Sequence, residues 1–170
     1  MRGIALSTAA FVALLVPAET AEAGDGCDKF AWSVARELAW FSAPDKVNVT
    51  SGARLATRPS GAFVMRLKPA GEASFVLPPE RTPRSDGSFG GTVSFPVVER
   101  AGIYQVTLSD EAWVDVIQDG RFVRSVGSSR RRDCSSVQKT VRLELAATSF
   151  VLQVSNVASD AIVIAISPSQ

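Results

Sequence analysis

The stretch AGIYQVTLSDEAWVDVIQDGRFVRSV, residues 101–126, predicts three strands and one tight turn. From Tyr104 to Leu108, apolar residues alternate with polar ones. This period of two places one face of a strand on a core and the other in water. Two further apolar runs flank Asp119-Gly120, a pair that favours a type I′ turn because both of its central residues take positive φ. We therefore expect a β-hairpin preceded by another strand.

A two-residue loop sets the hairpin register by counting outward from the turn. The expected partners are Ile117 with Phe122, Val116 with Val123, Asp115 with Arg124, and Trp113 with Val126. An opposite-charge pair across two strands contributes about 0.2 to 1 kcal/mol to a sheet. We expect a cross-strand ion pair between Asp115 and Arg124. The alternative is that Asp115 is a lone acid in a cleft.

The N-terminus has the pattern of a secretory signal peptide. Arg2 supplies a positive charge, residues 3–18 form an apolar run, and residues 21–23 have the small-x-small pattern that precedes a cleavage site. We expect residues 1–23 to be removed and the protein to be periplasmic or secreted. An uncleaved N-terminal anchor is the alternative.

Cleavage there would remove Arg2, Glu19 and Glu22 and leave 17 basic and 15 acidic side chains, a net charge of about +2. So small a charge predicts neither a nucleic-acid partner nor a strong attraction to membrane surfaces. Residues 24–170 have the size of one domain, and we expect no membrane span after cleavage.

The two cysteines, Cys27 and Cys134, both lie in the exported part of the chain. In an oxidising compartment they have one intramolecular pairing, so a disulfide is expected to tie the N-terminal segment to the region after the hairpin. Metal ligation is the alternative, but the chain has no His and no CxxC motif.

Residues 30–41, FAWSVARELAWF, have apolar side chains at helical spacing. The stripe consists of Phe30, Val34, Leu38 and Phe41. It predicts a short amphipathic helix over about residues 33–42, with Ser33 as the N-cap and with Arg36 and Glu37 away from the stripe. The two tryptophans of this segment are expected to pack on a sheet, and lining a ligand groove is the alternative.

Short β-like segments separated by turn residues fill most of the remaining chain. They are residues 47–50, 53–57, 62–67, 73–77, 92–97, 141–145, 150–155 and 162–166. Many short strands with regular turn residues are typical of a sandwich or barrel. We therefore predict an all-β domain, a two-sheet antiparallel β-sandwich of about eight or nine strands, jelly-roll-like, with a short N-terminal helix.

Two irregular stretches are the candidate ligand contacts. Residues 78–91 are rich in Pro and Gly, and residues 127–133 contain three consecutive arginines. The candidate ligand-binding residues are Arg81, Arg84, Arg130, Arg131 and Arg132. The ligand would be a protein or carbohydrate of the cell envelope. The alternatives are a connection between the sheets for the first stretch and a solvated loop for the second.

The absence of His excludes large classes of chemistry. Without it there is no Ser-His-Asp triad, no Cys-His pair, no His general base and no 2-His-1-carboxylate iron site. The acids Asp110, Glu111 and Asp115 are the nearest cluster for a carboxylate-based or calcium site, but they lack the spacing of either. We therefore expect no enzymatic activity and no cofactor, with these three acids as weak metal candidates.

The C-terminal half resembles the bacterial pre-peptidase C-terminal β-sandwich domain. The likeness rests on GIYQVTL at 102–108, AWVDVI at 112–117 and the turn Asp119-Gly120, and extends over residues 101–167. In that family a Gly-x-Tyr-x-hydrophobic strand precedes an Asp-bearing strand and a tight turn. The resemblance implies a β-sandwich. This chain has one Asp where those domains commonly show a pair, so the family's calcium binding is not carried over with the fold.

The whole chain is also similar to a group of small exported proteobacterial proteins of unknown function. The similar stretches are Cys27, FAWSVARELAWF, FVLPPER and YQVTLSDEAWVDVIQDG. Members of that group are sometimes labelled homogentisate 1,2-dioxygenase, an activity that needs His ligands for iron, which this chain lacks. The sequence thus predicts an exported, non-enzymatic binding or accessory module of the bacterial envelope. A carboxylate-based or metal-dependent enzyme and a purely structural envelope protein are the alternatives.

Overall fold

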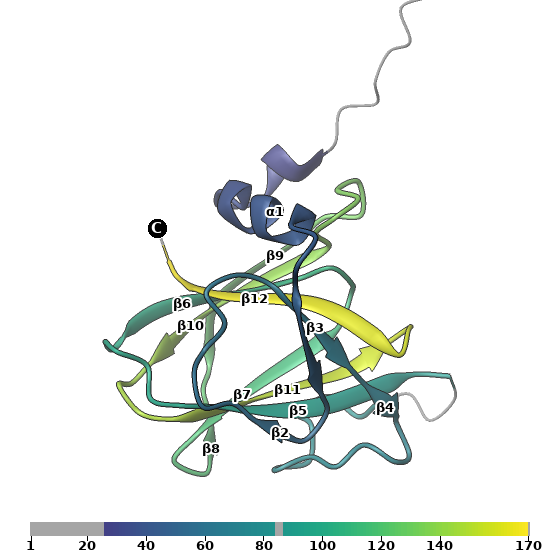
Figure 1. Ribbon diagram of the computed structural model, residues 1–170, viewed down its shortest axis with the longest axis vertical. Coiled ribbons are helices and arrows are strands. Elements are labelled where there is room, and N and C mark those ends of the chain that lie inside the picture. The colour runs from purple at the N-terminus through teal and green to yellow at the C-terminus, as the bar shows by residue number, and fades with distance from the viewer. Residues whose placement is uncertain (1–25, 84–86, 170) are drawn as a thin grey trace, which may run out of the picture.

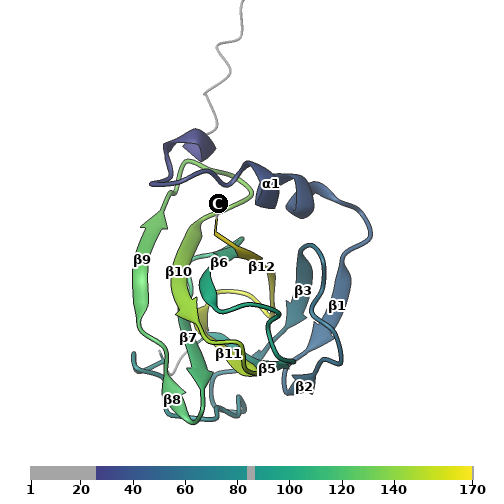
Figure 2. The same cartoon turned by 90° about the vertical axis from the view of Figure 1, so that its left-hand side faces the viewer.

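A computed structural model describes residues 26–83 and 87–169 (Figure 1). Two six-stranded sheets pack face to face as a sandwich, and one short helix lies on the outer side of one sheet (Figures 1 and 2). The predicted sandwich with an N-terminal helix is confirmed. The predicted signal peptide, residues 1–23, and Arg84 lie outside the described residues.

The strands of sheet A, in spatial order, are β1 (Val47–Thr50), β3 (Phe63–Arg66), β12 (Ala161–Pro168), β6 (Gly102–Leu108), β10 (Lys139–Leu145) and β9 (Ser125–Arg130). Those of sheet B are β2 (Ala53–Arg54), β5 (Phe89–Phe95), β11 (Phe150–Val157), β7 (Trp113–Gln118) and β8 (Arg121–Phe122), and β4 (Lys68–Pro69) also pairs with β5. Inward-facing residues of both sheets, among them Phe63, Leu108 and Leu152, form one continuous core.

The sheets are mixed, not purely antiparallel as predicted, and they contain more strands. β1 pairs with β3 in parallel, and so does β2 with β5. The chain leaves sheet A after β1, adds β2 to sheet B and returns to sheet A in the direction in which it left. This excursion makes β1 and β3 parallel neighbours. The short pieces after the helix therefore join two different sheets.

The turn at Asp119-Gly120 has the expected positive φ angles, 49° and 73°. Ile117 pairs with Phe122, and the Val123 N–H donates to the Val116 carbonyl, as predicted. Beyond that point the predicted register is wrong. The chain crosses to sheet A and forms β9, so Asp115 pairs with Gln153 of β11 and Arg124 is exposed. The pair of Trp113 with Val126 is likewise wrong.

Two local predictions are also wrong. Residues 73–77 are not a strand, because their backbone bonds to a side chain: the N–H groups of Val76 and Leu77 donate to Gln153 Oε1. Residues 127–130 are not a loop but most of β9, which pairs with β10. We call residues 73–83 the strap, since they cross the outer face of sheet B through Gln153 and Asp115.

The N-terminal segment begins with a 3₁₀ turn, η1 (Gly26–Lys29), and continues into α1 (Ala35–Ser42). The disulfide between Cys27 and Cys134 is confirmed, and it joins residues 107 apart in the sequence. Val34 rather than Ser33 is the N-cap, although Ser33 Oγ accepts the Ala35 N–H at 3.3 Å. Ser33 thus lies one residue too early to cap the helix.

The predicted helical stripe is buried or half-buried in a second apolar cluster against sheet A. The tryptophans of this segment, Trp32 and Trp40, pack against the same cluster, as the packing interpretation expected. Glu37 is also buried, at 1% exposure, where its Oε1 accepts hydrogen bonds from Arg36 and from Ser167 of β12. An ion pair and a hydroxyl therefore anchor α1 to the sheet beside the apolar contact.

The outer face of β6 is buried at Gln105 and Thr107, next to the N-terminal segment, whereas Ile103 on the same face is 45% exposed. Gln105 and Thr107, expected to be solvated, are 2% and 0% exposed. Thr140 links Thr107 to Trp32, whose indole N–H donates to Thr140 Oγ1 at 3.2 Å. A layer of bonded polar groups thus joins the N-terminal segment to sheet A. In the described part of the chain, no helix is long and apolar enough to cross a membrane.

Candidate functional site

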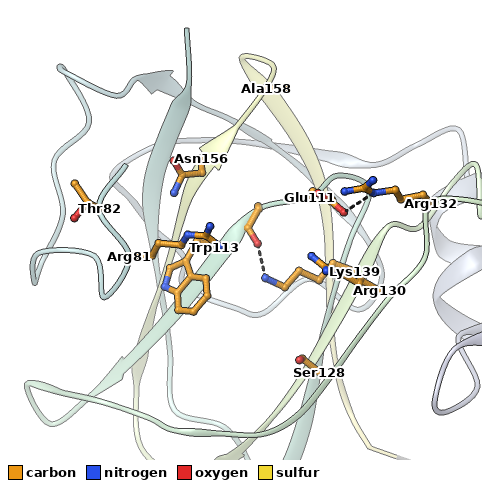
Figure 3. Close-up of a pocket in the computed structure, with 11 residues that line it drawn as sticks. Arg81, Thr82, Glu111, Trp113, Ser128, Arg130, Arg132, Lys139, Asn156 and Ala158 are labelled. Carbon is orange, nitrogen blue, oxygen red and sulfur yellow. Dashed lines mark hydrogen bonds and ion pairs between the residues drawn. The ribbon is translucent and has the colours of Figure 1, made fainter. Parts of the chain in front are cut away.

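A basic cleft opens at the side of the sandwich where the sheets end in β7–β8 and in β10–β9 (Figure 3). Its volume is about 730 Å³. The residues that line it are Arg81, Thr82, Glu111, Ala112, Trp113, Ser128, Arg130, Arg132, Lys139, Asn156 and Ala158. They come from the strap, both sheets and the turns between strands, so only the folded chain brings them together.

Lys139 bridges the two sheets at the centre of this cleft. It begins β10 on the side of the strand that carries Val141 and Leu143 into the core. Its Nζ donates to the Ala112 carbonyl at 2.5 Å and lies 5.3 Å from the centre of the Trp113 ring (Figure 3). Burial lowers the pKa of this ammonium; the Glu111 carboxylate raises it, and the positive charges of Arg130 and Arg81 lower it. These neighbours make the cleft favourable for negative charge.

Trp113 is held in place by the residues around it. Its indole N–H donates to Asp115 Oδ1 at 2.7 Å, and the Arg81 guanidinium lies 5.9 Å from the ring centre. The other oxygen of Asp115 accepts the backbone N–H of Glu80 at 3.3 Å. One carboxylate therefore orients the indole and fastens the strap that carries Arg81.

Burial raises the pKa of the Asp115 carboxyl, against the two hydrogen bonds, which lower it. Asp115 is 4% exposed and lies on the outer face of sheet B under the strap, not in the lining of the basic cleft. Both alternatives stated for this residue are therefore wrong: it neither pairs with Arg124 nor stands alone in a cleft.

The three acids considered for metal or acid–base chemistry point to different partners. Asp110 accepts a hydrogen bond from Ser109, Glu111 forms an ion pair with Arg132 at 3.3 Å, and Asp115 is bound as above. Among residues 26–83 and 87–169, no group of three or more His, Cys, Asp or Glu side chains is placed to hold a metal ion. Nothing in this geometry brings two of the acids face to face.

Of the predicted ligand-binding arginines, the structure brings together Arg81, Arg130 and Arg132 in the basic cleft. Arg131 instead forms an ion pair with Asp133 at 2.6 Å, which raises the pKa of the arginine and lowers that of the carboxyl. Sequence reasoning missed Lys139 and did not place Trp113. The signal for Lys139 was its alternation with Val141 and Leu143, which puts all three on one face of a strand.

A second hollow of about 460 Å³, lined by both aliphatic and charged side chains, continues the basic cleft. The two share Trp113, Ser128 and Lys139. The continuation is lined by Val114, Val123, Val141 and Leu143, together with Glu80, Arg124 and Ser125. The two hollows together form a groove with a basic end and an end where aliphatic side chains lie beside charged ones.

We compared the chain with protein-family models, with curated proteins and with solved structures. None of them matches it.

Proposed function

We propose that this protein is an exported, non-enzymatic binding module of the bacterial envelope whose basic cleft takes an anionic ligand. One observation carries the proposal: four basic side chains from three segments converge on the cleft, and one acidic side chain of the described residues lines it. That acid, Glu111, is paired with Arg132, so Arg81, Arg130 and Lys139 leave the cleft with a net positive charge. Such a field attracts and orients anions.

Export is supported by two independent features. The N-terminus has the pattern of a signal peptide. The Cys27–Cys134 disulfide fits an oxidising compartment outside the cytoplasm. We therefore assign the protein to the periplasm or the secreted fraction.

Binding rather than catalysis is supported by the state of the reactive groups. Among the described residues, the Lys139 amine is the one lysine amine in the lining of the cleft, and it is half-buried. It already donates to a backbone carbonyl and lies over an indole. The acids that a carboxylate-based or metal-dependent enzyme would use are separated and bonded elsewhere. Anchored cations around a groove are what recognition of a charged ligand needs.

Calorimetry with two polyanions, poly-L-glutamate and an oligogalacturonate, tests the proposal on the mature, oxidised protein. We expect both carboxylate polymers to bind at about 0.05 M salt and to weaken steeply toward about 0.5 M. The double variant Arg81→Ala/Arg130→Ala should bind about tenfold more weakly, since two of the cleft's charges are lost. A matched control, Arg54→Ala/Arg66→Ala, removes two exposed arginines of β2 and β3 and should stay within about twofold of wild type.

The proposal is wrong if neither polymer binds at low salt, or if the cleft variant and the control variant lose affinity equally. Equal losses would show that the net charge of the molecule, and not the cleft, attracts the polymer.

A further inference from the structure

We infer that the ligand is an acidic segment of a partner protein, bound in extended conformation as an added strand on β9. This inference rests on the proposed function, because it names the occupant of the same groove. Three observations carry it: the free edge of β9, the way its residues face, and the state of Trp113.

β9 is the last strand of sheet A, and no strand of the described residues pairs with its second edge. The Arg131 N–H donates to the Gln138 carbonyl at 2.9 Å, in line with the pairing of Arg130 with Lys139. Backbone groups point to alternate edges along a strand, so the N–H and C=O groups of Ser128 and Arg130 point away from β10. They form an open row of donors and acceptors.

The same two residues also turn their side chains into the basic cleft. Ser128 and Arg130 both line it. A strand laid on this edge would therefore form backbone hydrogen bonds with β9 while its own side chains on one face reach the cations of the cleft. Extended peptides bind exposed sheet edges in this way: the backbone supplies affinity and alternate side chains supply specificity.

The composition of β9 suits the approach of another strand. Its sequence is SVGSSR, and its small side chains leave the edge accessible. β9 contains no Pro or Lys to block pairing there. The one irregularity is at Val126, where the register with β10 shifts between Arg142 and Leu143. The regular part of the edge therefore runs from Gly127 to Arg130, next to the basic end of the groove.

The opposite wall of the groove is also a strand edge. β8 pairs with β7 at Ile117 and Gln118 only, so the first residues of β7 have no strand beside them on that side within the described chain. The Val116 carbonyl accepts the Val123 N–H on this side, and by alternation the backbone of Val114 faces the same way. The groove therefore has backbone groups on both walls and cations at one end, which matches an extended acidic peptide.

The contacts of Trp113 favour an acidic peptide over an acidic sugar as the ligand. Sugar-binding sites commonly use an open aromatic face as a stacking platform, but the Trp113 ring already has Lys139 and Arg81 within 6 Å of its centre. Its N–H is also taken by Asp115. The indole therefore serves to hold the two cations, and the recognition left to the groove is backbone pairing plus charge.

The test uses an eight-residue probe, acetyl-(Glu-Val)₄-amide, and two N-methylated versions, one methylated at every Glu and one at every Val. In an extended peptide the Glu amides point to one edge and the Val amides to the other. Strand addition on β9 therefore predicts that at least one methylated peptide binds about tenfold or more weakly than the parent. Peptide binding should also slow the exchange of the Ser128 and Arg130 amides.

A pair of variants tests the protein side. Ser128→Pro removes the outward N–H while leaving the hydrogen bonds between β9 and β10 intact. It should lower the affinity for the parent peptide about tenfold. Ser128→Ala keeps the N–H and loses only the hydroxyl, so it should weaken binding of the parent peptide clearly less than Ser128→Pro does. Circular dichroism and thermal melting show whether Ser128→Pro folds. If it does not, the methylated peptides and the amide exchange decide.

The outcomes separate the two proposals. Suppose that both methylated peptides bind like the parent and that Arg81→Ala/Arg130→Ala lowers the affinity for all three peptides. The anionic site then stands and strand addition is wrong. If the oligogalacturonate binds more tightly than the peptide with the same dependence on the two arginines, the occupant is an acidic glycan and the inference is wrong. If no anionic probe binds, the proposed function fails as well.

Discussion

Asp115 lies in the middle of β7, and each of its carboxylate oxygens accepts a hydrogen bond. The donors are the indole of Trp113 and the backbone of Glu80, so the side chain joins the sheet to the strap. The role of this carboxylate is structural: it holds Trp113 and the strap in place. Its removal leaves two donors without an acceptor at a site that is 4% exposed.

The first prediction concerns the energetics of this residue. Asp115→Ala should lower the free energy of unfolding by about 1 to 3 kcal/mol, because two partly buried donors lose their acceptor. The loss should be the same in an Arg124→Ala background, since Arg124 is exposed and β7 pairs with β11 at Asp115. Urea denaturation of the four proteins of this cycle measures both effects. A coupling energy of about 1 kcal/mol or more between the two substitutions would show that Asp115 and Arg124 do form an ion pair.

The second prediction concerns pH. Burial raises the folded-state pKa of Asp115 above its ordinary value of 3.8, so the folded state holds this proton more tightly than the unfolded chain does. The contribution of Asp115 to the free energy of unfolding is then most favourable below about pH 3.8, and it declines as the pH rises through the folded-state pKa. Relative to Asp115→Asn, which does not titrate, wild type should lose stability over this interval.

Urea denaturation of both proteins between about pH 3.5 and about pH 8 measures that difference. A stability difference that grows in favour of wild type with rising pH would mean that the hydrogen bonds from Trp113 and Glu80 outweigh burial, and would contradict the assigned direction.

At the scale of elements, the strap shows how a side chain replaces a strand partner. Gln153 of β11 accepts the N–H groups of Val76 and Leu77 and donates to the Leu77 carbonyl at 3.1 Å. These bonds occupy backbone groups that would otherwise pair in a sheet. The strap therefore lies across β11 instead of extending a sheet, and it carries Arg81 to the basic cleft.

The third prediction tests this role. Gln153→Leu should cost about 2 kcal/mol or more in the free energy of unfolding and speed the exchange of the Val76 and Leu77 amides, because three hydrogen bonds to the strap are lost. Ser155→Ala is the matched control on the same strand. Its Oγ is buried without a partner in the described chain, so its removal should be neutral or slightly stabilising. Unchanged exchange in Gln153→Leu would show that other contacts hold the strap.

At the scale of the whole molecule, the disulfide holds the N-terminal segment on the sandwich. α1 has eight residues and no side-chain cap, a length at which an isolated helix is unstable in water. Its order depends on the second apolar cluster, on the Glu37 and Ser167 contact, and on the covalent link from Cys27 to Cys134. The main core between the sheets does not include these residues.

The fourth prediction concerns the disulfide, which holds the N-terminal segment outside the main core. Cys27→Ser/Cys134→Ser should lower the free energy of unfolding by about 4 to 5 kcal/mol in the chain-entropy model, because the bridge closes a loop of more than a hundred residues. A urea titration with and without reductant measures the same loss in wild type. We also expect faster amide exchange in α1 than in β11 after reduction. A loss below about 1 kcal/mol would show that packing alone holds the segment.

Sequence patterns over a few residues predicted the features that depend on neighbouring residues in the chain. The hairpin turn follows from Asp119-Gly120, and most strands follow from alternation, because both are set by backbone preference and side-chain direction over a few residues. The disulfide followed from counting, since two cysteines have one pairing. The helix was found to within two residues of its start.

What the sequence by itself determined is therefore the sandwich class, the bridge and three of the cleft's arginines as candidates. The tertiary structure alone decided which strands pair across long separations, as where the chain leaves β8 for β9 and takes Arg124 away from Asp115. It also decided which polar faces are covered, as for Gln105, and that Lys139 meets Trp113 in the basic cleft. The physical reason is that alternation gives the direction of a side chain, whereas its partner depends on chain segments brought together only when the whole core forms.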